Sequence, residues 1–251
     1  ITTYNSSGYI EKSIKSVLNQ SIKVSHILII DDNSSDLFTL KKIITEINKK
    51  NFIEIKLISN EYNRGPGFSR NYAWSKCITE FIAFLDDDDF WYKDKLKQQM
   101  DIFKNDSTIK LVASKKKMTN QNISTYRNNN LLRITYSKLL FKNFIATSSV
   151  VLKTNLKERF LDKYYAEDYY LWLSIVKKGY SCYFINNYLC EESDIKKSLK
   201  LSSNFININK GVQSVLNLFY SKSLQNNILI FSAKFYYYIK FLFKLLFRRY
   251  S

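Results

Sequence analysis

Hydrophobic and polar positions along the first ninety residues repeat with two different periods. Short continuous apolar runs at residues 27–30 and 81–85 are typical of strands buried on both faces. Apolar positions three and four residues apart, as in residues 9–19 and 40–47, predict amphipathic helices. The pattern therefore predicts the order β-α-β-α-β-α-β, with strands near residues 1–4, 27–30, 53–58 and 81–85.

Strands that alternate with helices predict an α/β fold, with a mostly parallel sheet and right-handed crossovers. In open sheets of this kind, ligands bind at the carboxyl ends of the strands. Three polar clusters fall at such ends, in residues 2–5, 31–36 and 86–89. The sequence therefore predicts a functional site where these clusters meet.

The remaining sequence has weaker signals. Residues 93–103, 167–177, 202–218 and 224–249 are expected to be helices, and 111–113, 146–152 and 182–185 strands. A polar, Asn-rich segment at residues 115–130 is expected to be a loop.

Composition limits the partners that the chain can have. An apolar content of 45% excludes wholesale disorder, and a net charge of +17, concentrated near the C-terminus, suggests a membrane or nucleic-acid partner. A lysine-rich composition throughout is the simpler alternative. Three cysteines without CxxC spacing and the single His26, expected at a strand edge, argue against a disulfide framework, a zinc site and a Ser-His-Asp triad. With no signal peptide at the start of the sequence, we expect a cytoplasmic location.

Four consecutive aspartates, residues 86–89, directly follow a predicted buried strand. Two like charges ~4 Å apart repel by roughly 4 kcal/mol at an effective dielectric near 20, and a divalent cation would offset this repulsion. Mg²⁺ and Mn²⁺ take carboxylate and phosphate oxygens as ligands. The alternatives are a solvated acidic loop or a helix N-terminus carrying Asp89 or Asp94. The position at a strand end favours a metal site.

Five motifs occur in order along residues 1 to about 190: ITTYN at 1–5, IIDDNSSD at 29–36, NRG and SRN at 63–71, FLDDDDFW at 84–91, and ED with LWL at 167–173. Together they resemble glycosyltransferase family 2. The resemblance implies a Rossmann-like GT-A fold, an inverting transfer from a UDP- or other nucleoside-diphosphate sugar, and Mn²⁺ or Mg²⁺. It also implies a GT-A domain over 1–200, with a nucleotide-binding half (1–113) and an acceptor half (114–200), followed by a helical extension over 201–251.

The resemblance assigns the donor end of the site to four residues. Thr2 and Tyr4 would flank the nucleobase, and Asp32 would accept a hydrogen bond from the uracil edge. Capping of its own turn is the alternative for Asp32. Arg70 would reach the diphosphate, for which a guanidinium is well suited; its alternative is a solvated helix residue.

Five carboxylates would carry the metal and the acceptor chemistry. By resemblance, Asp88 is the direct metal ligand, with Asp86 or Asp87 near the ribose or a metal-bound water. The acceptor hydroxyl must lose its proton, and without a suitably placed histidine the base must be a carboxylate. Asp168 matches the family's base, and Glu167 would contact the acceptor or orient its loop. Compensation of a helix dipole is the alternative for both.

The C-terminal segment has its own pattern. Residues 228–247 are apolar apart from Ser232 and three lysines, which falls short of an uninterrupted ~20-residue membrane span. On a helical wheel the cations fall in one half and the large apolar side chains in the other. A basic amphipathic helix is typical of an interfacial membrane anchor, and packing on the domain or in a dimer is the alternative. The cations are Lys234, Lys240, Lys244, Arg248 and Arg249.

We therefore expect an inverting, metal-dependent hexosyl- or N-acetylhexosaminyltransferase, peripheral on the inner face of the plasma membrane. It would use a UDP-sugar and a polyprenyl-diphosphate-linked saccharide acceptor in bacterial surface-polysaccharide synthesis. A nucleotidyltransferase would need a Gly-rich, Lys-bearing phosphate loop near the N-terminus, which the sequence lacks. A nucleic-acid-binding protein would need a continuous basic groove, which the acidic strand ends oppose. No nucleic-acid partner is expected, and a homodimer remains possible.

Overall fold

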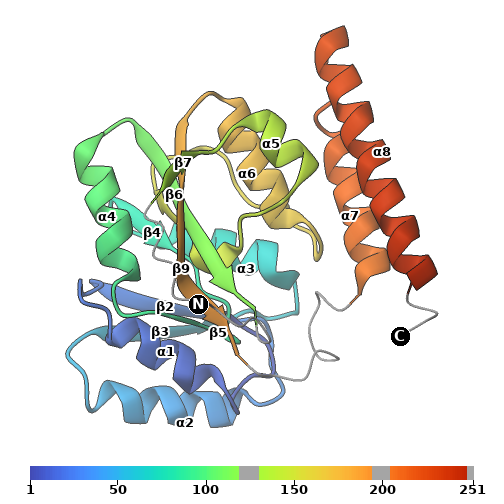
Figure 1. The fold of residues 1–251 in the computed structure, drawn as a ribbon. Helices are drawn as coiled ribbons and strands as arrows, with labels where there is room; N and C mark the ends of the chain where they lie inside the picture. The colour runs from blue at the N-terminus through green and yellow to red at the C-terminus, as the bar shows by residue number, and fades with distance from the viewer. Residues whose placement is uncertain (119–129, 194–203, 248–251) are drawn as a thin grey trace.

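A computed structural model describes residues 1–118, 130–193 and 204–247, with side chains described as far as residue 244. Within these ranges, the first part of the chain forms a parallel sheet in the order β1-β2-β3 (Figure 1). Helices α1 and α2 lie on one side of this sheet, and α3 lies on the other. The elements are β1 (Thr2–Thr3), α1 (Ile10–Leu18), β2 (His26–Asp31), α2 (Leu37–Asn48), β3 (Glu54–Ser59) and α3 (Gly65–Ser75).

A second, mixed sheet follows, in the order β4-β8-β6-β9-β5, with β7 paired to β9. Its β6 and β9 are parallel, and its other pairs are antiparallel. The strands are β4 (Phe81–Ala83), β5 (Asp89–Trp91), β6 (Ile109–Lys117), β7 (Leu131–Arg133), β8 (Val151–Lys153) and β9 (Ser181–Glu192). The helices are α4 (Lys95–Asn105), α5 (Tyr136–Phe141), the 3-10 turn η1 (Thr147–Ser149), α6 (Glu167–Lys177), α7 (Phe205–Asn217) and α8 (Leu224–Phe247).

The expected α/β class and the order of elements through β4 are confirmed. Helix α3, expected over residues 68–79, begins at Gly65 because Pro66 in its first turn has the backbone angle that a helix start needs. The loop expected from residue 115 is wrong for 115–117, which continue β6; residues 119–129 lie outside the described residues. Lys116 and Lys117 are ion-paired with Asp89 and Glu191, so a polar sequence forms a half-buried strand. Strands β5 and β7 and helix α5 were not expected.

The helical hairpin α7–α8 stands beside the α/β domain (Figure 1) and shares a hydrophobic core with it. Ile230 and Ala233 of α8 are buried in one cluster with Trp172 of α6 and Leu139 of α5. Burial of this kind contributes about 25 cal/mol per Å² of apolar surface. Packing on the domain, the alternative for the C-terminal segment, therefore holds for one side of α8. Ser202, Ser203, Arg248 and Arg249 of the expected helices lie outside the described residues.

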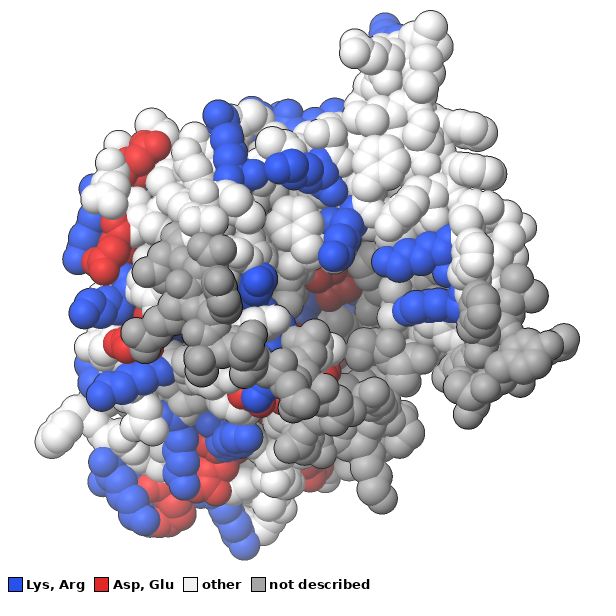
Figure 2. Space-filling view, viewed as in Figure 1, with Lys and Arg blue, Asp and Glu red and all other residues white. Residues whose placement is uncertain are grey.

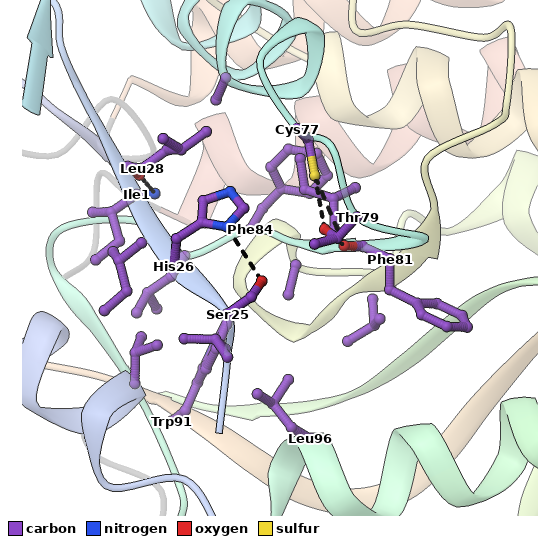
Figure 3. Close-up of a pocket in the computed structure, with 18 of the residues that line it drawn as sticks. Ile1, Ser25, His26, Leu28, Cys77, Thr79, Phe81, Phe84, Trp91 and Leu96 are labelled. Carbon is purple, nitrogen blue, oxygen red and sulfur yellow. Dashed lines mark hydrogen bonds between the residues drawn. The ribbon is translucent and has the colours of Figure 1, made fainter. Parts of the chain in front are cut away.

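An apolar cavity of about 370 Å³ lies between β2 and β4 (Figure 3). It forms because β1 pairs only with Ile30 and Asp31, which leaves the earlier residues of β2 facing this space. His26, the first residue of β2 as expected, lines the cavity and lies 3.2 Å from the Ser25 hydroxyl. The cavity lies toward the amino ends of β2 and β4, whereas the acidic run follows the carboxyl end of β4.

Candidate active site

The three polar clusters meet at the carboxyl ends of β1, β2 and β4, as the sequence predicts. Thr2 forms an isolated parallel bridge with Asp86, and the backbone N–H of Tyr4 donates to Asp87 Oδ2 over 3.2 Å. The N–H of Asn5 donates to Ser34 Oγ over 2.9 Å. The β1 end thus holds the acidic run against the turn after β2.

The carboxylates of the acidic run lie in different environments. Asp86, Asp87 and Asp88 are half-buried. Burial, with added repulsion from Asp88 and Asp86, raises the pKa of Asp87 to about 7, although hydroxyl groups of Ser6 and Thr3 oppose the rise. Burial also acts on Asp86, but nearby cations outweigh it and lower its pKa. Crowded negative charge at this turn is an environment that a cation would stabilise.

Asp89, the fourth aspartate, has a structural role instead. It is buried at the start of β5, where its carboxylate accepts from Lys116 Nζ over 2.6 Å and from the Ser148 hydroxyl. It is therefore not a free carboxylate at the start of α4. Asp94 lies at the N-cap position of α4, as that alternative expects, but makes no side-chain capping hydrogen bond.

Arg70 joins the acidic run to Glu167 at the start of α6. Arg70 is 6% exposed, and its Nη2 lies 2.7 Å from Asp86 Oδ1 while Nη1 lies 2.6 Å from Glu167 Oε1. The alternative of a solvated helix residue is wrong. The diphosphate role implied by resemblance stays a prediction, since both charged contacts of Arg70 are carboxylates of the protein.

Glu167 and Asp168 begin α6 after Ala166, a non-glycine residue with φ of 60°. Burial raises the pKa of Glu167 to about 7, against the opposing charge of Arg70. Burial also raises the pKa of Asp168. Asp168 Oδ1 accepts from the N–H of Tyr169 over 2.6 Å, and Oδ2 lies 3.3 Å from Thr147 Oγ1. A carboxylate held in this way, with raised proton affinity, suits general-base chemistry.

Asp32 organises the loop between β3 and α3. Its carboxylate is buried and accepts from Asn60 Nδ2, Arg64 N and Gly65 N at 2.8, 3.0 and 2.7 Å. Asp32 therefore caps the turn before α3 and not its own turn, which Asp31 caps by accepting from Ser34 N over 3.2 Å. A carboxylate has about four lone-pair positions, so a bond to a nucleobase stays compatible with the geometry. Tyr4 is 51% exposed beside this turn.

Sequence reasoning missed several partners of these residues. Asn60, Lys116, Thr147 and Ser148 hold Asp32, Asp89 or Asp168 through their side chains. Their sequence signals were weak, because Thr147 and Ser148 lie in a small-residue run interpreted as a strand. The pairing of β8, β6 and β9 brings Lys116, Thr147 and Ser148 to the site, and the pairing of β2 with β3 brings Asn60 next to Asp32.

The residues fit a metal that is held mainly by its substrate. No group of three or more His, Cys, Asp or Glu side chains in the described part of the chain could hold a metal ion alone. Mg²⁺ and Mn²⁺ typically take one or two carboxylates together with substrate phosphates. The clustered Asp87 and Asp88 supply oxygen donors of that type.

An α/β domain with an aspartate run at the strand ends, joined through an arginine to a buried Glu-Asp pair, defines a glycosyltransferase of the GT-A class. The model of glycosyl transferase family 2 matches residues 1–165, and the chain belongs to this family. The family match does not favour the two alternatives weighed from the sequence, a nucleotidyltransferase and a nucleic-acid-binding protein.

Known relatives extend the comparison beyond the family match. An Escherichia coli protein, UDP-Glc:alpha-D-GlcNAc-diphosphoundecaprenol beta-1,3-glucosyltransferase WfgD, is 34% identical over 203 residues, covering 80% of this chain and 78% of the relative. A Campylobacter jejuni GalNAc(5)-diNAcBac-PP-undecaprenol beta-1,3-glucosyltransferase is 27% identical over 188 residues, covering 71% of this chain and 59% of the relative.

Solved structures share the fold. A crystal structure of Staphylococcus aureus TarS 1–349 has a TM-score of 0.69 at 19% identity, covering 96% of this chain and 70% of TarS 1–349. The Pyrobaculum calidifontis mannosyltransferase PcManGT, in complex with GDP-Man and Mn²⁺, has a TM-score of 0.68 at 18% identity. The match covers 94% of this chain and 68% of the mannosyltransferase chain. These likenesses show the GT-A fold of the chain.

Proposed function

We propose that this glycosyltransferase moves a hexose or N-acetylhexosamine from a UDP-sugar to a saccharide carried on a polyprenyl diphosphate, with inversion at the anomeric carbon. The observation that supports it most is the Asp86–Arg70–Glu167 connection, which puts a donor-type aspartate turn next to a candidate base. Two relatives whose names specify undecaprenol-linked acceptors support the acceptor class.

The donor end uses the residues that the resemblance assigns. Thr2 and Tyr4 lie beside the nucleobase position, and Asp32 binds the edge of the base. Asp88 would hold the metal, with Asp86 or Asp87 near the ribose or a metal-bound water. The metal, Mn²⁺ or Mg²⁺, supplies Lewis-acid charge neutralisation at the diphosphate leaving group when bound. Neutralisation of the leaving group matters because negative charge develops on it as the glycosidic bond breaks.

The acceptor end uses Asp168 as the general base. Asp168 takes the proton of the attacking hydroxyl, which approaches the face of the sugar opposite to the leaving group. The Glu167–Arg70 ion pair fixes the start of α6 and so the direction of Asp168. Because Asp168 must be ionised and burial raises its pKa, turnover should fall as the pH drops through that raised value.

We further propose that the enzyme works as a peripheral protein on the inner face of the plasma membrane. In the described residues, no helix is long and apolar enough to cross a bilayer. The outward side of α8 exposes an apolar stripe that would contact the lipid instead. The stripe consists of Leu224, Ile228, Phe231, Phe235 and Tyr238. The donor half (1–113), acceptor half (114–200) and extension (201–251) remain the proposed functional division.

Transfer assays with two variants test this function. UDP-sugars are screened with Mn²⁺ and diphosphate-linked acceptors, and Asp168→Asn should lower turnover by roughly 10²–10⁴ with little change in UDP affinity. Asp88→Asn should abolish the Mn²⁺-dependent gain in UDP affinity measured by calorimetry.

Asp101→Asn provides the matched control, because this aspartate is exposed on α4 and should leave both measurements as in the parent. Parent-level transfer by Asp168→Asn would assign the base elsewhere. Equal UDP affinities of Asp88→Asn and the parent in Mn²⁺ would remove the metal assignment.

A further inference from the structure

Helix α8 carries two lysines on the side that faces the α/β domain. Ile230, Ala233 and Tyr237 follow one another at steps of three and four residues, so they share one side of the helix. Ile230 and Ala233 are buried against the domain, and Tyr237 is half-buried. The same steps lead to Lys240 and Lys244, which are both exposed. This side of α8 therefore packs on the domain as far as Tyr237 and stands clear of it at the lysines.

On one side, the segment after α5 connects the C-terminal half of α8 to the candidate base Asp168. The backbone N–H of Asn143, just after α5, donates to Tyr237 Oη over 3.0 Å. Four residues further along the chain, Thr147 contacts Asp168. Lys240 follows Tyr237 by three residues. The lysines therefore lie close to the Tyr237–Asn143 hydrogen bond, and through it close to the segment that contacts Asp168.

The flank formed by α7 leads to the same region. Phe241, next to Lys240, packs on Phe205 of α7 with ring centroids 5.7 Å apart. Six residues further along α7, a Cβ at Gly211 would lie 2.9 Å from Tyr165 Cβ, so the helix lies directly on the segment before α6. Tyr165 precedes Glu167 by two residues. Both flanks therefore place the lysine pair along the acceptor side of the active site.

The cationic side chains of the hairpin suit a phosphate ligand inside this space. Figure 2 shows cationic side chains of the hairpin facing the α/β domain across a hollow, with acidic side chains visible within it. The apolar stripe of α8 is on the opposite side of the helix, so the two lysines face the domain and not the surface that carries the stripe. Side chains four residues apart on a helix are ~5–6 Å apart at Cβ, a spacing that lets two ammonium groups bind one diphosphate.

We propose that Lys240 and Lys244 bind the diphosphate of the lipid-linked acceptor while its terminal sugar lies at Asp168. The inference rests on the proposed function, because the diphosphate belongs to that acceptor class. It assigns recognition of the acceptor's charged group to the C-terminal hairpin, which lies beyond the region that the family model matches.

Kinetics with matched acceptors test the proposal. The acceptor saccharide is offered either through a diphosphate on a hydrophobic alcohol or as an uncharged alkyl glycoside, in neutral detergent. Lys240→Ala/Lys244→Ala should raise KM for the diphosphate acceptor roughly tenfold, which is about 1.4 kcal/mol. The KM for the uncharged glycoside should change less than twofold. Lys41→Ala/Lys42→Ala removes the same charge from exposed positions on α2 and serves as the control.

Two further measurements separate the possible outcomes. Calorimetry of an alkyl diphosphate without sugar, at saturating UDP, should show weaker binding by the α8 variant and parent-level binding by the control, whether or not transfer occurs. A third kinetic arm places the uncharged glycoside in acidic phospholipid vesicles. Equal effects on charged and uncharged acceptors, unchanged alkyl diphosphate binding, or a loss confined to acidic vesicles would each overturn the diphosphate assignment. Failure of the parent on every acceptor would instead reject the proposed function.

Discussion

Arg70 shows how a single side chain can connect the two ends of this active site. It lies on α3, within the region assigned to the donor, and yet both carboxylates that it contacts would take part in the chemistry from opposite sides. Its guanidinium is buried, so the two ion pairs are poorly screened by solvent. Replacing it therefore affects stability and catalysis together.

Arg70→Met should destabilise the protein by about 3–5 kcal/mol, because Glu167 is left buried without its partner. Urea unfolding of the variant measures this loss. Adding Glu167→Gln should recover part of the stability without restoring turnover. Lys49→Met removes a similarly short ion pair, 2.6 Å from Glu46, at an exposed site and should barely change the unfolding midpoint. A loss as small as that of Lys49→Met would show that the Arg70 pairs contribute no specific stability.

Among the elements, α4 contains an unusual residue for its buried face. Lys95 is fully buried. Its Nζ lies 2.8 Å from Gln99 Oε1 and 4.2 Å from the centre of the Trp91 ring. Burial lowers the pKa of Lys95 to about 7. The neutral amine is therefore the favoured form in the folded protein above that pH.

This shift predicts how stability depends on pH. Between about pH 7 and the unfolded value near 10.5, the unfolded chain binds one more proton than the folded chain, so stability should rise with pH by up to about 1.4 kcal/mol per unit. Lys95→Met should remove this slope and be most stabilising, relative to the parent, near pH 7 and below. Chemical denaturation at several pH values gives the difference. Lys97→Met, at an exposed position on the same helix, should keep the parent slope; a parent slope in Lys95→Met would contradict the assignment.

At the scale of the whole molecule, the hairpin α7–α8 completes the core and also exposes the apolar stripe of α8. Because Ile230 and Ala233 belong to the core, truncation from residue 228 would damage the fold and could not test membrane binding. Substitution within the exposed stripe avoids this problem.

Phe231→Ser/Phe235→Ser should weaken binding to anionic vesicles at least tenfold, since full burial of each phenylalanine is worth about 1.5–3 kcal/mol. Vesicle flotation measures the bound fraction, and light scattering in parallel reports the mass in solution. Phe38→Ser, which removes an exposed ring from α2, is the control. If the variant floats with the vesicles as well as the parent does, the stripe does not bind the membrane. If the parent is a dimer and the variant a monomer, the stripe serves self-association instead.

The sequence by itself determined the class of fold, the order of elements through β4 and the position of the acidic run at a strand end. It could do so because these features depend on local periodicity and turn chemistry, which neighbouring residues set. The five motifs also determined the family and the candidates Asp88 and Asp168.

Only the tertiary structure decided which aspartates differ in role. Asp89 follows three similar residues in sequence, yet pairing of β5 with β9 and of β9 with β6 places it against Lys116. The same long-range pairing made a strand of residues 115–117, where the polar sequence suggested a loop. Arg70, Asp86 and Glu167 likewise come together from three separate elements, and the two sides of α8 acquire different environments only when one of them packs on the domain. Contacts between segments far apart in sequence set burial and charge at these positions, and local sequence carries no record of them.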